Sequence, residues 1–255
     1  MKIGAQFYTL REFCKTPEDL ALSLRKVADI GYTTVQLSAT CEFDAQWMKE
    51  QLAANGLQCV VTHVAPVKLQ EQMKQVCDDH KVFGCPNVGL GFFSFKKDPL
   101  EEQYKNFCDT YLPVAKGIKA EGLYFMYHNH NAEFRKLDGK PILDKMAEDF
   151  SADELGFILD TFWIQAGGAN PAEYIRRYAG RIPVIHLKDY QFATGEVKNS
   201  ICAIGDGNIN FSAVAAAAAD SGVDYMLVEQ DDCHGEDPFS AMKRSYDYLK
   251  AMGLE

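Results

Sequence analysis

Short apolar runs alternate with stretches of helical spacing along the whole chain. Each run is rich in β-branched or aromatic residues, a composition typical of β-strands. The predicted strands are 3–9, 34–39, 58–65, 87–93, 123–130, 155–163, 182–190 and 225–230. After the first strand, four apolar residues share one helical face: Leu20, Leu24, Val27 and Ala28. The last strand precedes a similar helical stretch at 239–252. The pattern predicts eight strand–helix units.

Helix start signals support these units. A capping side chain stands directly before a proline at four places: Thr16, Asp98, Asn170 and Asp237. Eight units of about 30 residues with no linker predict an α/β protein with a single (β/α)8 TIM barrel domain over 1–255. A doubly wound open sheet would usually carry a glycine-rich first turn, and 7–10 contains no glycine.

Composition and charge narrow the class of protein. The 255 residues hold 26 Lys+Arg against 36 Asp+Glu, a net charge of -10, and 47% are hydrophobic. Such a chain is too apolar for disorder and too acidic to favour a nucleic acid partner. No apolar run approaches the roughly 18 residues of a membrane span. Because Met1–Gly4 leads straight into the first strand, we expect no secretory leader, a cytoplasmic location and reduced thiols at the eight cysteines.

The carboxyl ends of the predicted strands are dense in ionisable residues. These ends converge on one mouth of a TIM barrel, where the chemistry of such barrels takes place. The residues concerned are His63, His128, His130, Glu133, Asp160, His186, Lys188 and Glu229.

Asp160, His186 and Glu229 each close an apolar run on three consecutive strands. A lone histidine at such a place is usually a core residue, but a buried carboxylate without a partner costs several kcal/mol. One divalent cation would explain all three side chains. Glu133, on the loop after the fifth strand, is the preferred fourth ligand because the site is rich in carboxylates, and His128 is its rival.

Other residues are expected to contact a substrate. Lys188 shares a face with His186, so it could hold a phosphate, a hydroxyl or a developing oxyanion. Trp163 could form a platform for a sugar ring, although a core aromatic is an equal interpretation. Gln6, Tyr8, His63 and His130 also face the predicted mouth. Gly205-Asp206-Gly207-Asn208 is a weak phosphate-loop signal and is more typical of a turn before a helix capped by Asn210.

Five segments, taken together and in order, resemble a known family. They are Tyr127-His128-Asn129-His130 with Glu133-Phe134, Leu159–Trp163, His186–Asp189, Gly205–Gly207 and Val228–Asp231. The whole chain resembles the xylose isomerase-like superfamily of TIM barrels, in its sugar phosphate isomerase/epimerase branch. Relatives in that superfamily include ketose 3-epimerases, inosose dehydratase, hydroxypyruvate isomerase and endonuclease IV.

The resemblance implies a Glu-Asp-His-Glu metal site across strands five to eight. Asp160, His186 and Glu229 match it directly. Two positions depart from it: many epimerases close strand five with a glutamate where this chain has His128, and many members carry a histidine where this chain has Trp163.

The expected function is a divalent-metal-dependent isomerase or epimerase acting on a small sugar, sugar phosphate or keto sugar. The reaction would remove an α-proton, with Glu229, Glu133 or His128 as the base, and pass through a metal-bound enediolate. Mn²⁺ is the expected ion, with Mg²⁺, Co²⁺ and Zn²⁺ as alternatives. The runner-up is a dehydratase or lyase acting on a keto sugar or inosose. A non-catalytic sugar-binding protein is an alternative of another class, and an endonuclease IV-like phosphodiesterase is the least favoured. We expect a carbohydrate substrate, no nucleic acid or membrane partner, and leave a homo-oligomer open.

Overall fold

The computed structural model describes residues 1–192 and 201–255. Eight parallel strands form its centre: β1 (Lys2–Gln6), β2 (Thr34–Leu37), β3 (Gln58–His63), β4 (Asn87–Leu90), β5 (Tyr124–His128), β8 (Leu155–Asp160), β9 (Val184–Leu187) and β12 (Tyr225–Val228). They close into a barrel in the order β1-β12-β9-β8-β5-β4-β3-β2. The prediction of a single (β/α)8 TIM barrel is confirmed.

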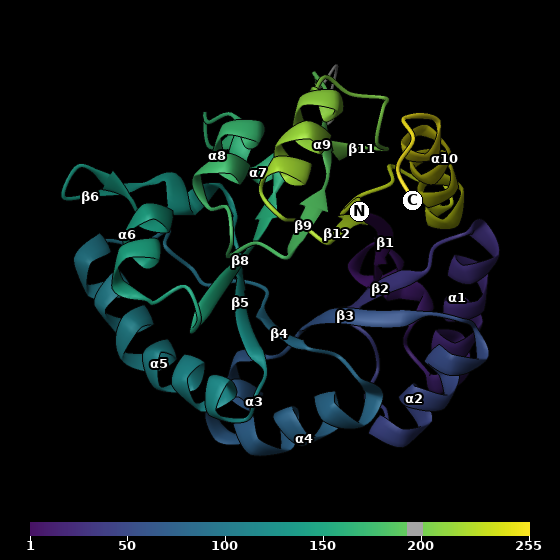
Figure 1. Cartoon of the computed structure of the whole chain (residues 1–255), viewed down its shortest axis with the longest axis horizontal. Coiled ribbons are helices and arrows are strands. Elements are labelled where there is room, and N and C mark those ends of the chain that lie inside the picture. Colours follow the sequence, from purple (N-terminus) through teal and green to yellow (C-terminus); the bar gives the residue numbers. More distant parts are fainter. Residues whose placement is uncertain (193–200) are drawn as a thin grey trace.

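Helices surround the strands (Figure 1). The α-helices are α1 (Pro17–Ile30), α2 (Ala45–Ala54), α3 (Pro66–Glu71), α4 (Met73–Phe83), α5 (Leu100–Ala120), α6 (Ile142–Asp149), α7 (Thr161–Ala166), α8 (Pro171–Arg177), α9 (Phe211–Asp220) and α10 (Pro238–Ala251). Two 3-10 helices, η1 (Phe7–Phe13) and η2 (Asn131–Phe134), follow β1 and β5. Two small antiparallel hairpins pair β6 (Lys136–Leu137) with β7 (Lys140–Pro141) and β10 (Asp189–Tyr190) with β11 (Ile201–Cys202).

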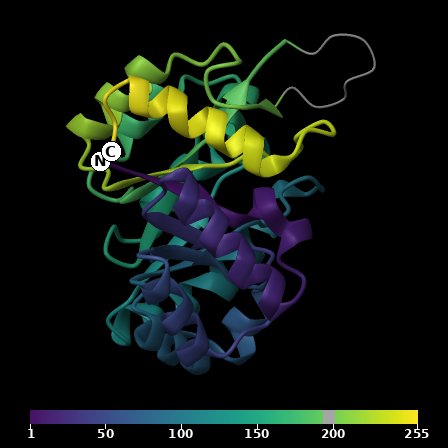
Figure 2. The same ribbon diagram turned by 90° about the vertical axis from the view of Figure 1, so that its right-hand side faces the viewer.

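The apolar pattern explains how these layers pack. On α1, Leu20, Leu24 and Val27 are fully buried against the barrel. Burying a leucine side chain stabilises a fold by about 1.5–3 kcal/mol, so one such face can hold a helix in place. The two chain ends lie side by side (Figure 2), where the Ile3 N–H donates to the backbone oxygen of Glu255.

A separate apolar cluster lies among the barrel strands. It contains Met126, Ile158, Val184 and Leu227 from four neighbouring strands. Side chains two positions apart in a strand point to the same face. The residues two positions further along therefore share a face with this cluster, and they are His128, Asp160, His186 and Glu229.

Several strands end earlier than the sequence predicts. β8 ends at Asp160, because its carboxylate accepts the Trp163 N–H at 2.9 Å and so caps α7. Trp163 therefore lies on a helix rather than at the end of a strand, and Tyr8 likewise lies on η1. The caps at Thr16, Asn170 and Asp237 are confirmed.

The predicted cap at Asp98 is wrong. α5 begins at Leu100 after Pro99, and the Asp98 carboxylate binds the guanidinium of Arg135 instead. Among residues 1–192 and 201–255, every helix is too short or too polar to span a lipid bilayer.

Candidate metal centre

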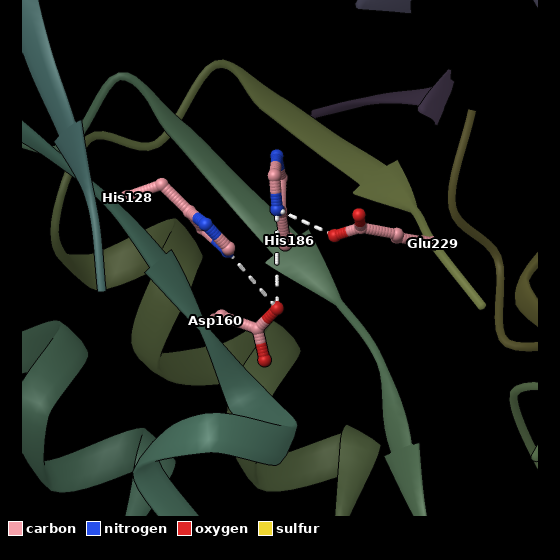
Figure 3. Close-up of side chains that lie close together, drawn as sticks. All are labelled: His128, Asp160, His186 and Glu229. Carbon is pink, nitrogen blue, oxygen red and sulfur yellow. Dashed lines mark hydrogen bonds and ion pairs between the residues drawn. The ribbon is translucent and has the colours of Figure 1, made fainter. Parts of the chain in front are cut away.

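Four buried side chains meet at the carboxyl ends of four neighbouring strands. His128, Asp160, His186 and Glu229 each offer one ligand atom, and these atoms all lie within 4.8 Å of one another. Figure 3 shows the four side chains pointing toward a common centre. His128 Nε2 lies 3.2 Å from Asp160 Oδ2, and His186 Nδ1 lies 2.9 Å from Glu229 Oε2.

Hydrogen bonds behind the two histidines fix which ring nitrogen faces the centre. His186 Nε2 lies 2.7 Å from Gln36 Oε1, and His128 Nδ1 lies 3.0 Å from the carbonyl oxygen of Gly91. Both partners are acceptors, so each ring donates its proton away from the centre. This leaves a lone pair on His186 Nδ1, the arrangement that metal-binding histidines adopt, and directs His128 Nε2 toward Asp160 Oδ2. Burial opposes a charge on His128, but the Asp160 carboxylate outweighs it and raises the pKa of His128. Burial lowers the pKa of His186 and so favours its neutral form.

The arrangement fits a cation. With the His186 proton on Nε2, Nδ1 and Glu229 Oε2 are two acceptors facing each other across 2.9 Å. The Lys188 ammonium lies 3.1 Å from Glu229 Oε2, but within residues 1–192 and 201–255 no hydrogen-bond donor faces His186 Nδ1. A divalent ion bound to both atoms would relieve their remaining repulsion. Imidazole nitrogens combined with carboxylate oxygens are ligands that divalent zinc, manganese and cobalt accept.

Lys188 supplies a positive charge at the edge of this centre. Its side chain is 1% exposed, and Nζ lies 3.1 Å from both Asp160 Oδ2 and Glu229 Oε2 and 2.9 Å from Asp231 Oδ1. Burial opposes the charge, but the three carboxylates outweigh it and raise the pKa of Lys188. Burial also opposes ionisation of Glu229, yet Lys188 and His186 hold its pKa well below the usual range. Burial raises the pKa of Asp231 to about 6.

Glu133, the preferred fourth ligand from sequence, lies outside the group of four, and its rival His128 lies within it. The Glu133 carboxylate accepts the hydroxyl of Tyr127 and, at 2.9 Å, the His130 N–H. It thereby closes a capping box on η2. Both carboxylate oxygens of Glu133 thus accept hydrogen bonds from nearby residues of the same segment, and this explains why Glu133 does not reach the centre.

The remaining predicted residues surround the same mouth. Gln6 Nε2 donates to Glu229 Oε1 at 2.8 Å. His63 packs against His128 and His186, with ring centroids 5.2 and 5.7 Å away. His130 packs between His128 and Trp163. A cavity of about 680 Å³ opens here, with Tyr8, His63, His128, His130, Lys188 and Glu229 in its wall. It extends to the segments after β2 and β3.

Two residues of this region were not predicted as site residues. Gln36 orients His186, and Asp231 pairs with Lys188. The signal for Gln36 is a polar residue inside a strand that is otherwise buried and largely apolar, and the signal for Asp231 is a carboxylate two positions after Glu229.

The weak phosphate-loop signal has an internal explanation. The buried Asp189 carboxylate accepts the N–H groups of Gly205, Gly207 and Ile209 at 2.9, 3.0 and 3.2 Å. Asn210 then caps α9, as the turn interpretation predicts. The loop binds a carboxylate of its own chain.

Comparison with known proteins agrees with this fold. The family model described as the xylose isomerase-like TIM barrel matches residues 24–252. The chain belongs to this family. Its curated relatives include an inosose dehydratase of Clostridium perfringens, 24% identical over 161 residues, which are 57% of this chain and 52% of the relative. The chain thus spans about half the length of the curated relatives it matches.

Solved structures of the family cover nearly the whole chain. A sugar phosphate isomerase/epimerase from Parabacteroides distasonis is 26% identical, with a TM-score of 0.82 and 98% of both chains covered. An L-ribulose 3-epimerase is 17% identical, with a TM-score of 0.76 and coverage of 98% and 93%. The IOLI protein, solved with a zinc atom, is 15% identical, with a TM-score of 0.74 and coverage of 98% and 97%. The last two share the fold. The named relatives are thus sugar isomerases, epimerases and dehydratases.

Proposed function

We propose that this protein is a divalent-metal-dependent enzyme that removes the proton α to the carbonyl of a small sugar or keto sugar. The observation that carries the proposal is the buried group of four ligands, in which His186 Nδ1 and Glu229 Oε2 face each other as acceptors. The similarity to sugar isomerases, epimerases and dehydratases supports the same chemistry.

His128, Asp160, His186 and Glu229 would hold the ion, with Gln36 and the Gly91 carbonyl orienting the two rings. A divalent cation held there would supply Lewis acidity toward the carbonyl and hydroxyl oxygens of a substrate. Mn²⁺ remains the expected ion. The zinc in the IOLI protein makes Zn²⁺ the first alternative to test.

The protein's own groups have distinct roles in proton removal. Glu229 is ionised, lies in the cavity wall and is held by a hydrogen bond from Gln6, so its carboxylate is the group assigned to take the α-proton. Lys188 reaches the same cavity with a permanent positive charge and would stabilise negative charge developing on the substrate oxygen.

The outcome after proton removal defines two candidates. Return of the proton gives epimerisation or isomerisation, the reactions named for the Parabacteroides distasonis structure. Loss of a β-substituent gives dehydration, the reaction named for the curated relatives. Dehydration is the second candidate because these relatives match by sequence.

The test combines metal content with proton exchange. Wild-type protein should hold about one divalent ion per chain, and Asp160→Ala and His128→Ala should lose it. Glu133→Gln is the matched control, because that carboxylate serves η2, and it should keep the ion. Keto sugars should incorporate solvent deuterium at the α-carbon, followed by NMR, and Glu229→Gln should abolish this exchange. Binding of a sugar without exchange would instead indicate a non-catalytic sugar-binding protein.

A further inference from the structure

The cavity beside the candidate metal centre has little positive charge to offer an anion. Its described wall contains two lysines, no arginine and four acidic residues. The acidic residues are Glu42, Asp79, Glu229 and Asp231. Lys68 is paired with Glu42 at 2.5 Å, and Lys188 is paired with three carboxylates. A phosphate monoester brings a further charge of about −1.5 to −2, which these paired lysines do not balance.

Several backbone amides around the mouth are also already used. The converging N–H groups of the loop after β11 bind the Asp189 carboxylate. Helices α2 and α7 are capped by Asp44 and Asp160, whose carboxylates accept first-turn N–H groups at 2.9 Å. A helix N-terminus attracts phosphate through these N–H groups and the helix dipole, so an internal carboxylate there takes the place of the anion.

Neutral hydrogen-bonding side chains, by contrast, are frequent in the wall, among them Tyr8, Gln72 and Gln75. His63 also lies in this wall, and its Nε2 has no hydrogen-bond partner within the described residues. Ser38 Oγ lies 3.2 Å from His63 Nδ1 and so holds that ring. Hydroxyl and amide groups of this kind exchange hydrogen bonds with the hydroxyl groups of a ligand and carry no charge that would attract a phosphate.

We infer that the cavity binds an uncharged polyhydroxy compound, a free keto sugar or a cyclic polyol ketone, and discriminates against its phosphate ester. The reaction assumed here is that of the proposed function. The substrate class follows from the charges and hydrogen-bonding groups of the cavity wall.

Matched pairs of compounds test the inference. Binding to the metal-loaded protein would be measured by calorimetry for D-fructose and its 6-phosphate, D-xylulose and its 5-phosphate, and an inosose and its phosphate ester. We expect the uncharged member of at least one pair to bind tenfold or more tightly than its ester. The inference is overturned if an ester binds more tightly than its parent in any pair, or if no uncharged member binds.

A pair of variants ties the discrimination to the cavity. Glu42→Gln releases Lys68, so the ester-to-parent affinity ratio should rise threefold or more. Glu236→Gln removes the same charge at an exposed position paired with Arg244, outside the cavity wall, and should leave the ratio as in the wild type. An equal rise in both variants would attribute the discrimination to net charge and overturn the role of the cavity.

Deuterium exchange separates the two proposals. If an uncharged sugar binds but exchanges no α-proton, the proposed function fails and the substrate class stands. If exchange occurs faster with a phosphate ester than with its parent, the reaction stands and the substrate class fails.

Discussion

Replacing Gln36 by leucine should weaken metal binding without unfolding the protein. Gln36 Oε1 holds the proton of His186 on Nε2, 2.7 Å away, and this keeps Nδ1 free toward the centre. Without that acceptor, His186 is free to move its proton to Nδ1 and donate it to Glu229 Oε2, only 2.9 Å away. A metal ion would then have to break this hydrogen bond to reach both ligands.

The size of the effect follows from that hydrogen bond. A hydrogen bond to a charged group contributes about 1.5–3 kcal/mol. At 1.4 kcal/mol per tenfold, the dissociation constant of the metal should rise roughly 10–100-fold, the range typical for loss of a residue that orients a metal-binding histidine. The stability of the metal-free protein should change little, because the new hydrogen bond replaces the old one and Gln36 Nε2 is itself buried without a partner in the described structure.

Titration of Co²⁺ against a competing chelator measures the affinity, and urea denaturation of metal-free protein measures the stability. Gln36→Glu is the control, because its carboxylate keeps an acceptor near His186 Nε2 and should retain metal binding. An unchanged affinity in Gln36→Leu, or an equal loss in Gln36→Glu, would refute the role assigned to the tautomer of His186.

Three further outcomes are expected. Asp189→Ala should lower the free energy of unfolding by about 3 kcal/mol and expose 201–210 to proteolysis, because three N–H groups lose a charged acceptor; an unaltered cleavage rate would contradict this. Burial lowers the pKa of His80 from 6.5 to about 4 in the folded protein. As the pH falls, the histidine of the unfolded chain therefore takes up a proton before that of the folded protein does. The free energy of unfolding should fall by about 3 kcal/mol between pH 7 and a pH below 4. In His80→Gln that part of the pH dependence, followed by urea denaturation, should disappear, and its persistence would show that other groups cause it. Tyr127→Phe removes a donor from the buried Glu133 carboxylate and should cost about 1–3 kcal/mol of stability while metal content stays at the wild-type level; loss of metal would return Glu133 to the ligand set.

The barrel could be predicted because patterns within short stretches of the sequence specify each strand and each helix. Period-two and helical patterns alternate eight times, and each strand places its last inward residue at the same mouth. Met126 and His128, and likewise Leu227 and Glu229, are two positions apart and share a face. Asp160, His186 and Glu229 could therefore be placed together from the end of each strand alone.

The fourth member required information that sequence spacing does not contain. Glu133 lies five residues beyond His128, on a loop whose path depends on whether its carboxylate turns inward or back on the chain. The hydroxyl of Tyr127 and the His130 N–H turn it back. Gln36 is separated from His186 by 150 residues, so their hydrogen bond depends on barrel closure and register. Such a pair cannot be identified from one sequence.

The charges of the centre connect the metal proposal with the substrate inference. Asp160, Glu229 and Asp231 carry three negative charges when ionised, and Lys188 returns one positive charge. Uncompensated buried charge is costly, so two remaining negative charges would call for a divalent ion. With such an ion bound, the net charge of the three carboxylates, Lys188 and the ion is zero. A centre of this kind can polarise a carbonyl, but it has no surplus positive charge for a phosphate. The arrangement of charges that favours a metal ion at the mouth of this barrel therefore also favours an uncharged sugar as its substrate.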